Sequence, residues 1–428
     1  MVAQQELNLI QAVRKENIQQ VETILKEGVN VNTTDPHHTT ALIYAVQRGD
    51  LKIVELLLQS GANVNHQKQP QGVSALMLAA SGNHLAILDA LIQAGADVNQ
   101  VNSDGSPALM IAVYKGYTDI VQRLLDAGAD VNLQDNDGDT ALSLAIQQNY
   151  IGIAIQLIQT GINIHQLYPD DETALTLAAE KGNFDLISSL LKAGSDVNHA
   201  TTTGDTALLI AATEGHTEAV RLLLASGVNI HHQNHEGETA LHLATIEGHL
   251  AIVQILLQAG IKATQRNQLG DTPLIISALQ GYEEIVKELL KYQANPNVEN
   301  QRETPLTLAI AQEHLNIVKI LLDSGANPNQ FYLDGKTVLM KAAELNNVVL
   351  IQYLLSAGAD INQKDKNGGT AIMWASYRGS LEAVQLLLQS ANISLDDRNP
   401  GGLTALILAQ LQQQHEIVSL LQKAGARE

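Results

Sequence analysis

Four histidines lie close together in one short segment of this 428-residue chain, and such clusters are candidate metal sites. They are His231, His232, His235 and His242. Zinc requires three or four ligands that fixed elements hold in a tetrahedron. The segment lacks the H-E-x-x-H spacing that places two histidine ligands on one face of a helix. We therefore interpret these histidines as solvated or structurally hydrogen-bonded; the alternative, a metal protein, predicts bound metal in the purified chain.

A run of acidic residues from Asp135 to Asp139 resembles half of a calcium-binding loop. Carboxylates at alternate positions before Gly138 could surround a hard cation. A complete loop would also need an acidic residue at position 133 and a glutamate at position 144, where the chain has Leu133 and Leu144. Because Asp and Gly are the residues that tight turns favour, we predict a turn here.

Motifs for catalysis are lacking elsewhere in the sequence. The chain has no cysteine, which excludes disulfides, thiolate catalysis and cysteine–zinc sites. It contains no G-x-x-x-x-G-K-S/T phosphate loop and no G-x-S-x-G nucleophile turn. Asp170 and Asp171 are paired acids that could exchange protons with a substrate, but the sequence around them predicts a turn and gives no sign of a closed cleft. We predict that the protein is not an enzyme and uses no cofactor.

The charge balance is strongly acidic. Against 25 Lys and Arg stand 45 Asp and Glu, which gives a formal net charge of −20 at pH 7. Nucleic acids and anionic membranes attract clustered Lys and Arg, so we expect neither as a partner. The segment MVAQQELNLI lacks the pattern of a signal peptide, and apolar stretches such as 252–257 are too short to span a bilayer. We expect a soluble, cytoplasmic protein.

One unit is repeated along the whole chain. A T-A-L or T-P-L step recurs every 33 residues, with spacings of 34, 32 and 34 at three junctions. The aligned residues are Leu42, Leu76, Leu109, Leu142, Leu175, Leu208, Leu241, Leu274, Leu306, Leu339, Ile372 and Leu406. Counting back from Leu42 reaches Leu9, which gives thirteen repeats and leaves no stretch for a second domain.

Each repeat has the residues of a turn followed by two short helices. The first helix begins at an aligned threonine, the starter residue, whose hydroxyl can cap free N–H groups of the first turn. Ser74 and Pro107 replace it in repeats three and four. A glycine that can adopt the left-handed conformation ends the second helix in eleven of thirteen repeats. Gln293 and Ala391 are the exceptions, so we expect strain or a local change there.

The pattern G-x-T-A/P-L-x-x-A, then G-H, L-L and G-A-D-V-N, resembles the ankyrin repeat. Repeat eight shows it best, in Gly237, Thr239, Leu241, His242, Ala244, Gly248, His249, Leu256, Leu257 and Gly260. The resemblance implies an all-α fold, an α-solenoid of stacked helix-turn-helix repeats with β-hairpin loops. It also implies a curved superhelix with the first helices and hairpin tips on its concave face, and a hydrogen-bonding role for His242. We predict one solenoid over residues 1–428, with capping repeats at 1–33 and 395–428 and internal repeats at 34–394.

Acidic residues at the hairpin tips and first helices point to a basic partner protein. The candidate partner-binding residues in repeats four to nine are Asp104, Tyr114, Tyr117, Asp137, Asp139, Asp171, Glu172, Glu180, Asp205, Glu214, Glu236, Glu238, Glu247, Asp271 and Tyr282. The acids would steer a basic patch or peptide and the tyrosines would anchor it; alternatively, the acids serve only solubility and the helix dipoles. We predict a monomeric scaffold that binds another protein. The alternatives are a structural or self-assembling repeat protein and a regulatory subunit of a larger complex.

The single tryptophan, Trp374, lies on the predicted first helix of repeat twelve. The aligned residues of the other repeats are mostly Leu or Ile. A large apolar side chain in that register predicts packing in the core rather than contact with a partner.

Overall fold

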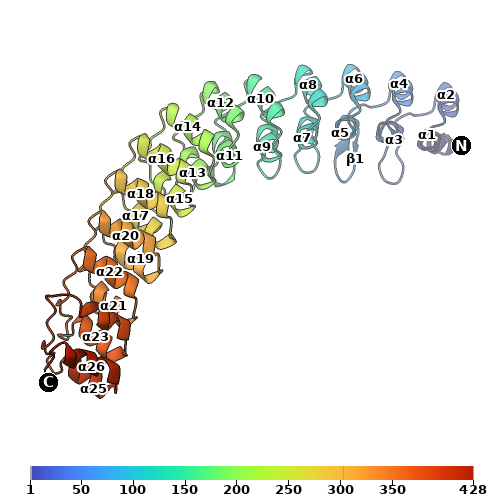
Figure 1. Ribbon diagram of the computed structural model, residues 1–428. Coiled ribbons are helices and arrows are strands. Elements are labelled where there is room, and N and C mark those ends of the chain that lie inside the picture. Colours follow the sequence, from blue (N-terminus) through green and yellow to red (C-terminus); the bar gives the residue numbers. More distant parts are fainter. Residues whose placement is uncertain (1, 302, 428) are drawn as a thin grey trace. The chain divides into compact units, whose positions relative to one another are not determined.

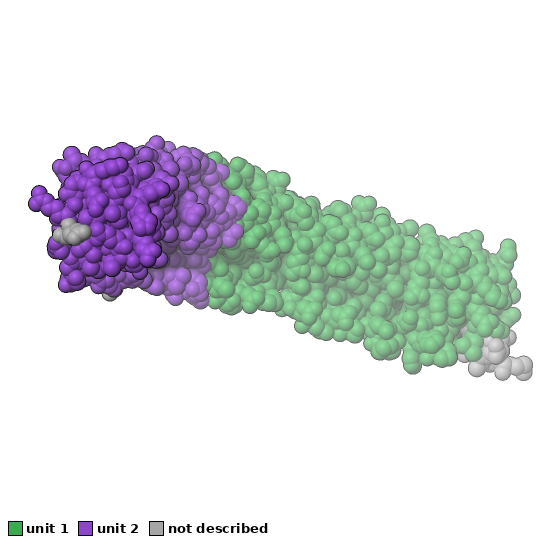
Figure 2. All heavy atoms as spheres, turned by 60° about the horizontal axis from the view of Figure 1, so that its bottom comes forward, with its two compact units in different colours: residues 1–228 green, residues 229–428 purple. Residues whose placement is uncertain are grey.

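The chain folds into paired helices. The computed structural model describes residues 2–301 and 303–427, and this part of the chain forms 26 α-helices in thirteen pairs. They separate into two compact units, residues 1–228 and residues 229–428, which are coloured in Figure 2. Within each unit the odd-numbered helices form one row and the even-numbered helices another (Figure 1). The repeated helix-turn-helix packing confirms the predicted fold class, whereas one solenoid over the whole chain stays a prediction.

The first unit holds repeats one to seven. Its helices are α1 (Val2–Arg14), α2 (Ile18–Lys26), α3 (Ala41–Arg48), α4 (Leu51–Gln59), α5 (Ala75–Ser81), α6 (Leu85–Gln93), α7 (Ala108–Tyr114), α8 (Thr118–Asp126), α9 (Ala141–Gln147), α10 (Ile151–Gln159), α11 (Ala174–Glu180), α12 (Phe184–Ala193), α13 (Ala207–Thr213) and α14 (Thr217–Ala225). A two-stranded antiparallel hairpin, β1 (Gln67–Lys68) with β2 (Val73–Ser74), precedes α5, and the 3₁₀ turn η1 (Pro169–Asp171) precedes α11.

The second unit holds repeats eight to thirteen. Its helices are α15 (Ala240–Ile246), α16 (Leu250–Gln258), α17 (Pro273–Gln280), α18 (Glu283–Lys291), α19 (Pro305–Ala311), α20 (Leu315–Asp323), α21 (Val338–Glu344), α22 (Val348–Ser356), α23 (Ala371–Arg378), α24 (Leu381–Leu387), α25 (Ala405–Leu411) and α26 (His415–Lys423). None of the helices in the described part of the chain is long and apolar enough to cross a membrane.

Most starter residues cap the first helices as the sequence predicts, but the Thr206 and Thr370 hydroxyls make no cap hydrogen bond. In α3 the Thr40 hydroxyl accepts a hydrogen bond from the Ile43 N–H at 3.3 Å, and Ser74 accepts one from Met77 at the start of α5. A cap of this kind stabilises a helix by about 1 kcal/mol. Pro107 begins α7 without a side-chain cap, and its fixed φ of −79° suits the start of a helix.

Aligned apolar residues build the core between successive helix pairs. Leu142 and Ala145 of α9 are fully buried, as are Val253 and Leu256 of α16. Within each unit, odd helices contact the next odd helix and their own even partner, so each repeat buries residues that it could not bury alone. Burying a Leu or Val side chain contributes roughly 1.5–3 kcal/mol.

The two repeats without a helix-ending glycine differ from the others in the predicted way. Gln293 adopts a positive φ of 63° after α18, a conformation that glycine reaches without strain. Ala391 avoids a positive φ; instead α24 has seven residues, where the second helices α22 and α26 have nine. The repeat that contains Gln293 therefore keeps the common backbone geometry under strain, whereas the repeat that contains Ala391 has a shorter second helix.

Most hairpins are held by a side chain rather than by paired strands. In repeat five the Asp135 carboxylate accepts hydrogen bonds from the N–H groups of Asp137 (3.0 Å) and Asp139 (2.9 Å). This geometry confirms the predicted turn and uses the carboxylate within the hairpin. Neighbouring tips are joined by a backbone hydrogen bond, as from the Asn136 N–H to the Asp104 carbonyl at 2.9 Å. The tips are thereby held in a fixed row within the unit.

Candidate interaction surfaces

Helix geometry decides which side chains of each first helix meet solvent. In α9 the residues four and seven places after the starter Thr140, Leu144 and Gln147, lie on the uncovered side, and the residues between them are buried. Residues three and four apart share one face of a helix, so the same two positions recur in the other first helices. The residue seven places after the starter is half-buried or exposed from α3 to α25. The residue four places after it is half-buried in some helices, as Leu144 is, and buried in others, as Leu177, Ile276 and Leu308 are. Together with the hairpin residues, these positions form the outward face of the odd-numbered row.

The acidic residues of the first unit gather on this outward face. Asp104, Asp137, Asp171 and Glu214 are exposed, and the first three lie on hairpins. Three further acidic residues, Asp139, Glu172 and Asp205, occupy the position directly before the starter residue in repeats five, six and seven. All three are half-buried.

Internal partners engage part of this acidic set. Asp139 accepts hydrogen bonds from the Ser143 hydroxyl (2.7 Å) and the Gln147 amide (3.0 Å), and Asp205 accepts one from the Thr203 hydroxyl (2.6 Å). Glu180 pairs with Lys181 at 2.7 Å. Burial, followed by repulsion from Glu180 and Asp170, raises the pKa of Glu172 above its ordinary value. Carboxylates are thus crowded enough in repeat six to repel one another.

The second unit contains the other four predicted acids. Glu236 and Glu247 are exposed, whereas Glu238 and Asp271 are half-buried. Burial raises the pKa of the Asp271 carboxyl, and Glu303 acts in the same direction; the hydrogen bond from the Asn300 amide partly offsets both.

The three predicted tyrosine anchors differ in exposure. Tyr114, at the end of α7, is 54% exposed, and the Lys115 ammonium lies 5.6 Å from its ring centroid. Tyr117 is half-buried at the start of α8. The Tyr282 ring lies against Gly248 of the preceding repeat, and its hydroxyl is 3.5 Å from the Ile246 carbonyl. Tyr282 therefore contributes to stacking between repeats, and Tyr114 offers the largest aromatic surface of the three.

The His242 side chain has a structural role. His242 is fully buried; its Nδ1 lies 2.9 Å from the Thr239 hydroxyl and its Nε2 lies 3.3 Å from the carbonyl of Asp271 in the next repeat. Burial lowers the pKa of His242 to about 4, although hydrogen bonds to backbone act in the opposite direction. Over residues 2–301 and 303–427, no group of three His, Asp or Glu side chains is placed to hold a metal ion.

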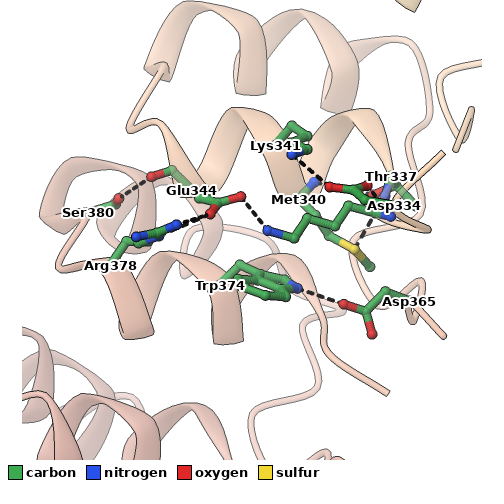
Figure 3. Close-up of polar contacts among 10 residues, drawn as sticks. Asp334, Thr337, Met340, Lys341, Glu344, Asp365, Trp374, Arg378 and Ser380 are labelled. Atoms are coloured by element: carbon green, nitrogen blue, oxygen red, sulfur yellow. Dashed lines mark hydrogen bonds and ion pairs between the residues drawn. The ribbon is translucent and has the colours of Figure 1, made fainter. Parts of the chain in front are cut away.

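Trp374 is not where the sequence predicts it. It lies on the outward side of α23 and is only half-buried, because its position, four residues after the starter Thr370, is an outward one. Its indole N–H donates to Asp365 at 2.8 Å, and the Lys336 ammonium lies 3.4 Å from its ring centroid (Figure 3). The aligned Leu243 and Leu408 are also half-buried but the aligned Leu177 and Leu308 are buried, so alignment with leucine does not decide whether this position lies in the core.

A half-buried carboxylate joins two cations beside Trp374. Glu344 binds the Lys336 ammonium at 2.6 Å through one oxygen and the Arg378 guanidinium at 2.7 Å through the other (Figure 3). Burial acts to raise the pKa of Glu344, but the hydrogen bonds from the two cations outweigh it and hold this pKa below its ordinary value. Sequence reasoning missed this cluster; the available signal was Lys336, which occupies a position that is acidic in the six preceding repeats.

Comparison with known proteins agrees with the repeat pattern. A family model for ankyrin repeats in three copies matches residues 9–102, 76–168, 109–201, 175–267, 261–332 and 339–427. A search of curated proteins finds no match to the chain.

Proposed function

The chain belongs to the ankyrin-repeat proteins, and we propose that it binds a basic partner protein through the acidic outward face of its first unit. Ankyrin repeats form protein–protein interaction modules. The proposed face consists of the hairpins and first helices of repeats four to seven, from Asp104 to Glu214. We propose the same role for Glu236, Glu238, Glu247 and Asp271 within the second unit.

The observation that carries the proposal is the crowding of carboxylates around Glu172. Burial raises the pKa of this residue, and the nearby carboxylates of Glu180 and Asp170 raise it further, so the folded chain holds negative charges close together. A partner that brings Lys or Arg to this face would relieve that repulsion. Exposed charges of one sign also steer an oppositely charged partner and raise its association rate.

Rigid presentation supports the same conclusion. Backbone hydrogen bonds join neighbouring tips, from Ser103 to Gln71, from Asn136 to Asp104 and from Thr202 to Asp170, each at 2.9 Å. Side chains on these tips lose little conformational entropy when a partner binds, because the backbone is already ordered. The face acts as a scaffold, and the proposal requires no catalytic step.

The test compares two variants that change the net charge equally. The first reverses the exposed outward acids, with Asp104→Lys, Asp137→Lys, Asp171→Lys and Glu214→Lys. The control reverses four exposed acids of the even-numbered helices, with Asp119→Lys, Asp126→Lys, Asp185→Lys and Glu218→Lys. Circular dichroism verifies the fold of both.

The probe is a labelled pool of short peptides in which Lys or Arg alternates with Leu, Ile, Met or Pro, and binding is followed by fluorescence anisotropy. We expect the wild type and the control to bind, and the outward variant to bind at least about tenfold more weakly. Binding of the wild type should weaken as salt shortens the screening length from about 10 Å at 0.1 M to about 3 Å at 1 M. Equal affinity of the two variants, or binding that is insensitive to salt, would refute the proposal.

A further inference from the structure

The acidic pattern of the outward face ends at repeat eleven. The residue directly before the starter residue is acidic in six consecutive repeats, as Asp139, Glu172, Asp205, Glu238, Asp271 and Glu303. In repeats eleven, twelve and thirteen it becomes Lys336, Gly369 and Leu403. The tips change too: Asn367 occupies the position that is Asp334 in the preceding repeat. The last repeats of the second unit therefore present a different chemistry from the repeats before them.

A hollow of about 470 Å³ opens at this place, between the hairpins and first helices of repeats eleven to thirteen. We call it the Trp374 hollow. Its walls include the apolar side chains of Met373, Trp374, Tyr377 and Leu408, and Arg378 and Asn367 lie at its edge. This volume lies within the range of sites that bind small ligands or a few side chains, which is roughly 300–1,000 Å³.

The indole that forms one wall is held on several sides. Asp365 accepts the indole N–H at 2.8 Å, and Tyr377 packs edge-on with its ring centroid 6.2 Å away. The Lys336 ammonium covers the ring at 3.4 Å. A Cβ at position 369 would lie only 3.0 Å from the indole nitrogen, so Gly369 leaves the room that this arrangement needs. A fixed aromatic wall binds an apolar side chain without the entropy loss of ordering itself.

The charge that meets solvent at the hollow is positive. Asp365 is 7% exposed, and its carboxylate also accepts the N–H groups of Asn367 and Gly369, each at 2.8 Å. The Glu344 side chain is 9% exposed and is shared by Lys336 and Arg378, so Glu344 and Asp365 together balance the two cations. Both carboxylates are covered, and Arg378 is the exposed ionised group. The Arg378 side chain is 55% exposed, and it binds Glu344 through Nε and Nη2. The guanidinium also lies 5.9 Å from the Tyr377 ring centroid, so an exposed cation stands beside the aromatic wall.

We propose that the Trp374 hollow is a second binding site, which takes an acidic peptide segment of a partner protein. An aliphatic or proline side chain of the peptide packs on Trp374, Tyr377 and Leu408, and a neighbouring carboxylate pairs with Arg378. Charge complementarity selects this occupant, because the first unit and repeats eight to ten present carboxylates on the outward face whereas this hollow presents a guanidinium. The inference does not depend on the basic partner proposed for the first unit.

The chain supplies its own reporter for the test. Trp374 is the only tryptophan in the sequence, so a change in tryptophan emission reports binding at this hollow in the full-length protein. The probes are two pools of short peptides without Trp or Tyr, in which Leu, Ile, Met or Pro alternates with Asp or Glu in one pool and with Lys or Arg in the other. We expect the acidic pool to shift the emission saturably and the basic pool to leave it unchanged.

Two variants and a control sharpen the test. Arg378→Gln should weaken binding of the acidic pool about tenfold, the effect of losing one charge-assisted hydrogen bond. Asn367→Asp introduces a carboxylate at the edge of the hollow, as the aligned Asp334 does in repeat eleven. It should weaken binding of the acidic pool up to about fivefold at low salt. Lys319→Gln, an exposed cation on α20, should change nothing.

The outcomes separate this site from the acidic face of the first unit. An unchanged emission with the acidic pool would overturn the inference, as would equal affinity of the wild type and Arg378→Gln. If Arg378→Gln fails to fold, Asn367→Asp decides, because its new side chain is one that an aligned hairpin already carries. Binding of the basic pool to the first unit is measured separately by anisotropy, so either proposal can fail alone.

Discussion

Burial of His242 should make repeat eight sensitive to mild acid. Burial lowers the pKa of this histidine from 6.5 to about 4, because protonation would place a charge in the fully buried start of α15. Below pH 6.5 the unfolded chain binds a proton that the folded chain does not bind until about pH 4. The stabilisation is therefore complete above pH 6.5 and is lost progressively as the pH falls toward 4. A pKa difference of this size corresponds to roughly 3 kcal/mol of unfolding free energy.

The assay compares the wild type with His242→Leu, since leucine is the aligned residue of repeat seven, Leu209. The free energy of unfolding is measured in urea between about pH 7 and about pH 4, and hydrogen exchange of the α15 amides assigns the change to repeat eight. We expect the wild type to lose roughly 3 kcal/mol more than the variant over this range. His235→Gln serves as the control, because His235 is exposed in the adjacent hairpin.

Two results would refute this reasoning. The first is an equal loss of stability in the wild type and in His242→Leu over the acidic range, which would show that His242 does not link folding to protons. The second is a direct titration of the His242 ring by nuclear magnetic resonance with a midpoint near its ordinary value of 6.5. A change in His235→Gln as large as that in His242→Leu would likewise show that burial is not the cause.

Two further substitutions in the second unit test the backbone strain at Gln293 and the ion pairs of Glu344. Gln293→Gly should raise the unfolding free energy by about 1 kcal/mol, because it relieves a positive φ of 63°; an unchanged or lower urea midpoint would contradict this. Glu344→Gln should lower it by about 2 kcal/mol, since the half-buried carboxylate accepts charge-assisted hydrogen bonds from Lys336 and Arg378, and should change Trp374 emission as Lys336 is released. Glu284→Gln, which removes an exposed carboxylate, should do neither.

The positions of the helices could be predicted from the sequence because local chemistry sets them. The hydroxyl of a starter residue such as Thr40 caps the helix that follows it in most repeats, although Thr206 and Thr370 begin their helices without a cap bond. The strain at Gln293 could be predicted for the same reason, since only the identity of one residue in a helix-ending turn decides it. The role of His242 could also be predicted, because its partners are the starter residue of its own repeat and a backbone carbonyl of the next.

The Trp374 hollow could not be predicted, because three different repeats build it. Helical spacing places Trp374 on a face of α23 but does not say what covers that face. The ring is held by Asp365 from its own hairpin and by Lys336 from the preceding repeat, and the room for it depends on Gly369. Aligned leucines suggested a core position, although Leu243 and Leu408 at that position are themselves half-buried.

The hairpins explain how one repeated fold can present opposite charges. In repeats five, eight, twelve and thirteen an Asp or Asn side chain accepts the backbone N–H of the residue that precedes the starter residue. The donating N–H groups belong to Asp139, Glu238, Gly369 and Leu403, and their nitrogens lie 2.9, 2.9, 2.8 and 3.0 Å from the accepting side-chain oxygens. The turn therefore uses only the backbone of this position, and its side chain can change from carboxylate to hydrogen or isobutyl without loss of the hydrogen bond. Because stacking involves the buried helix faces, substitution at this outward position changes the charge that a repeat presents while the fold is maintained.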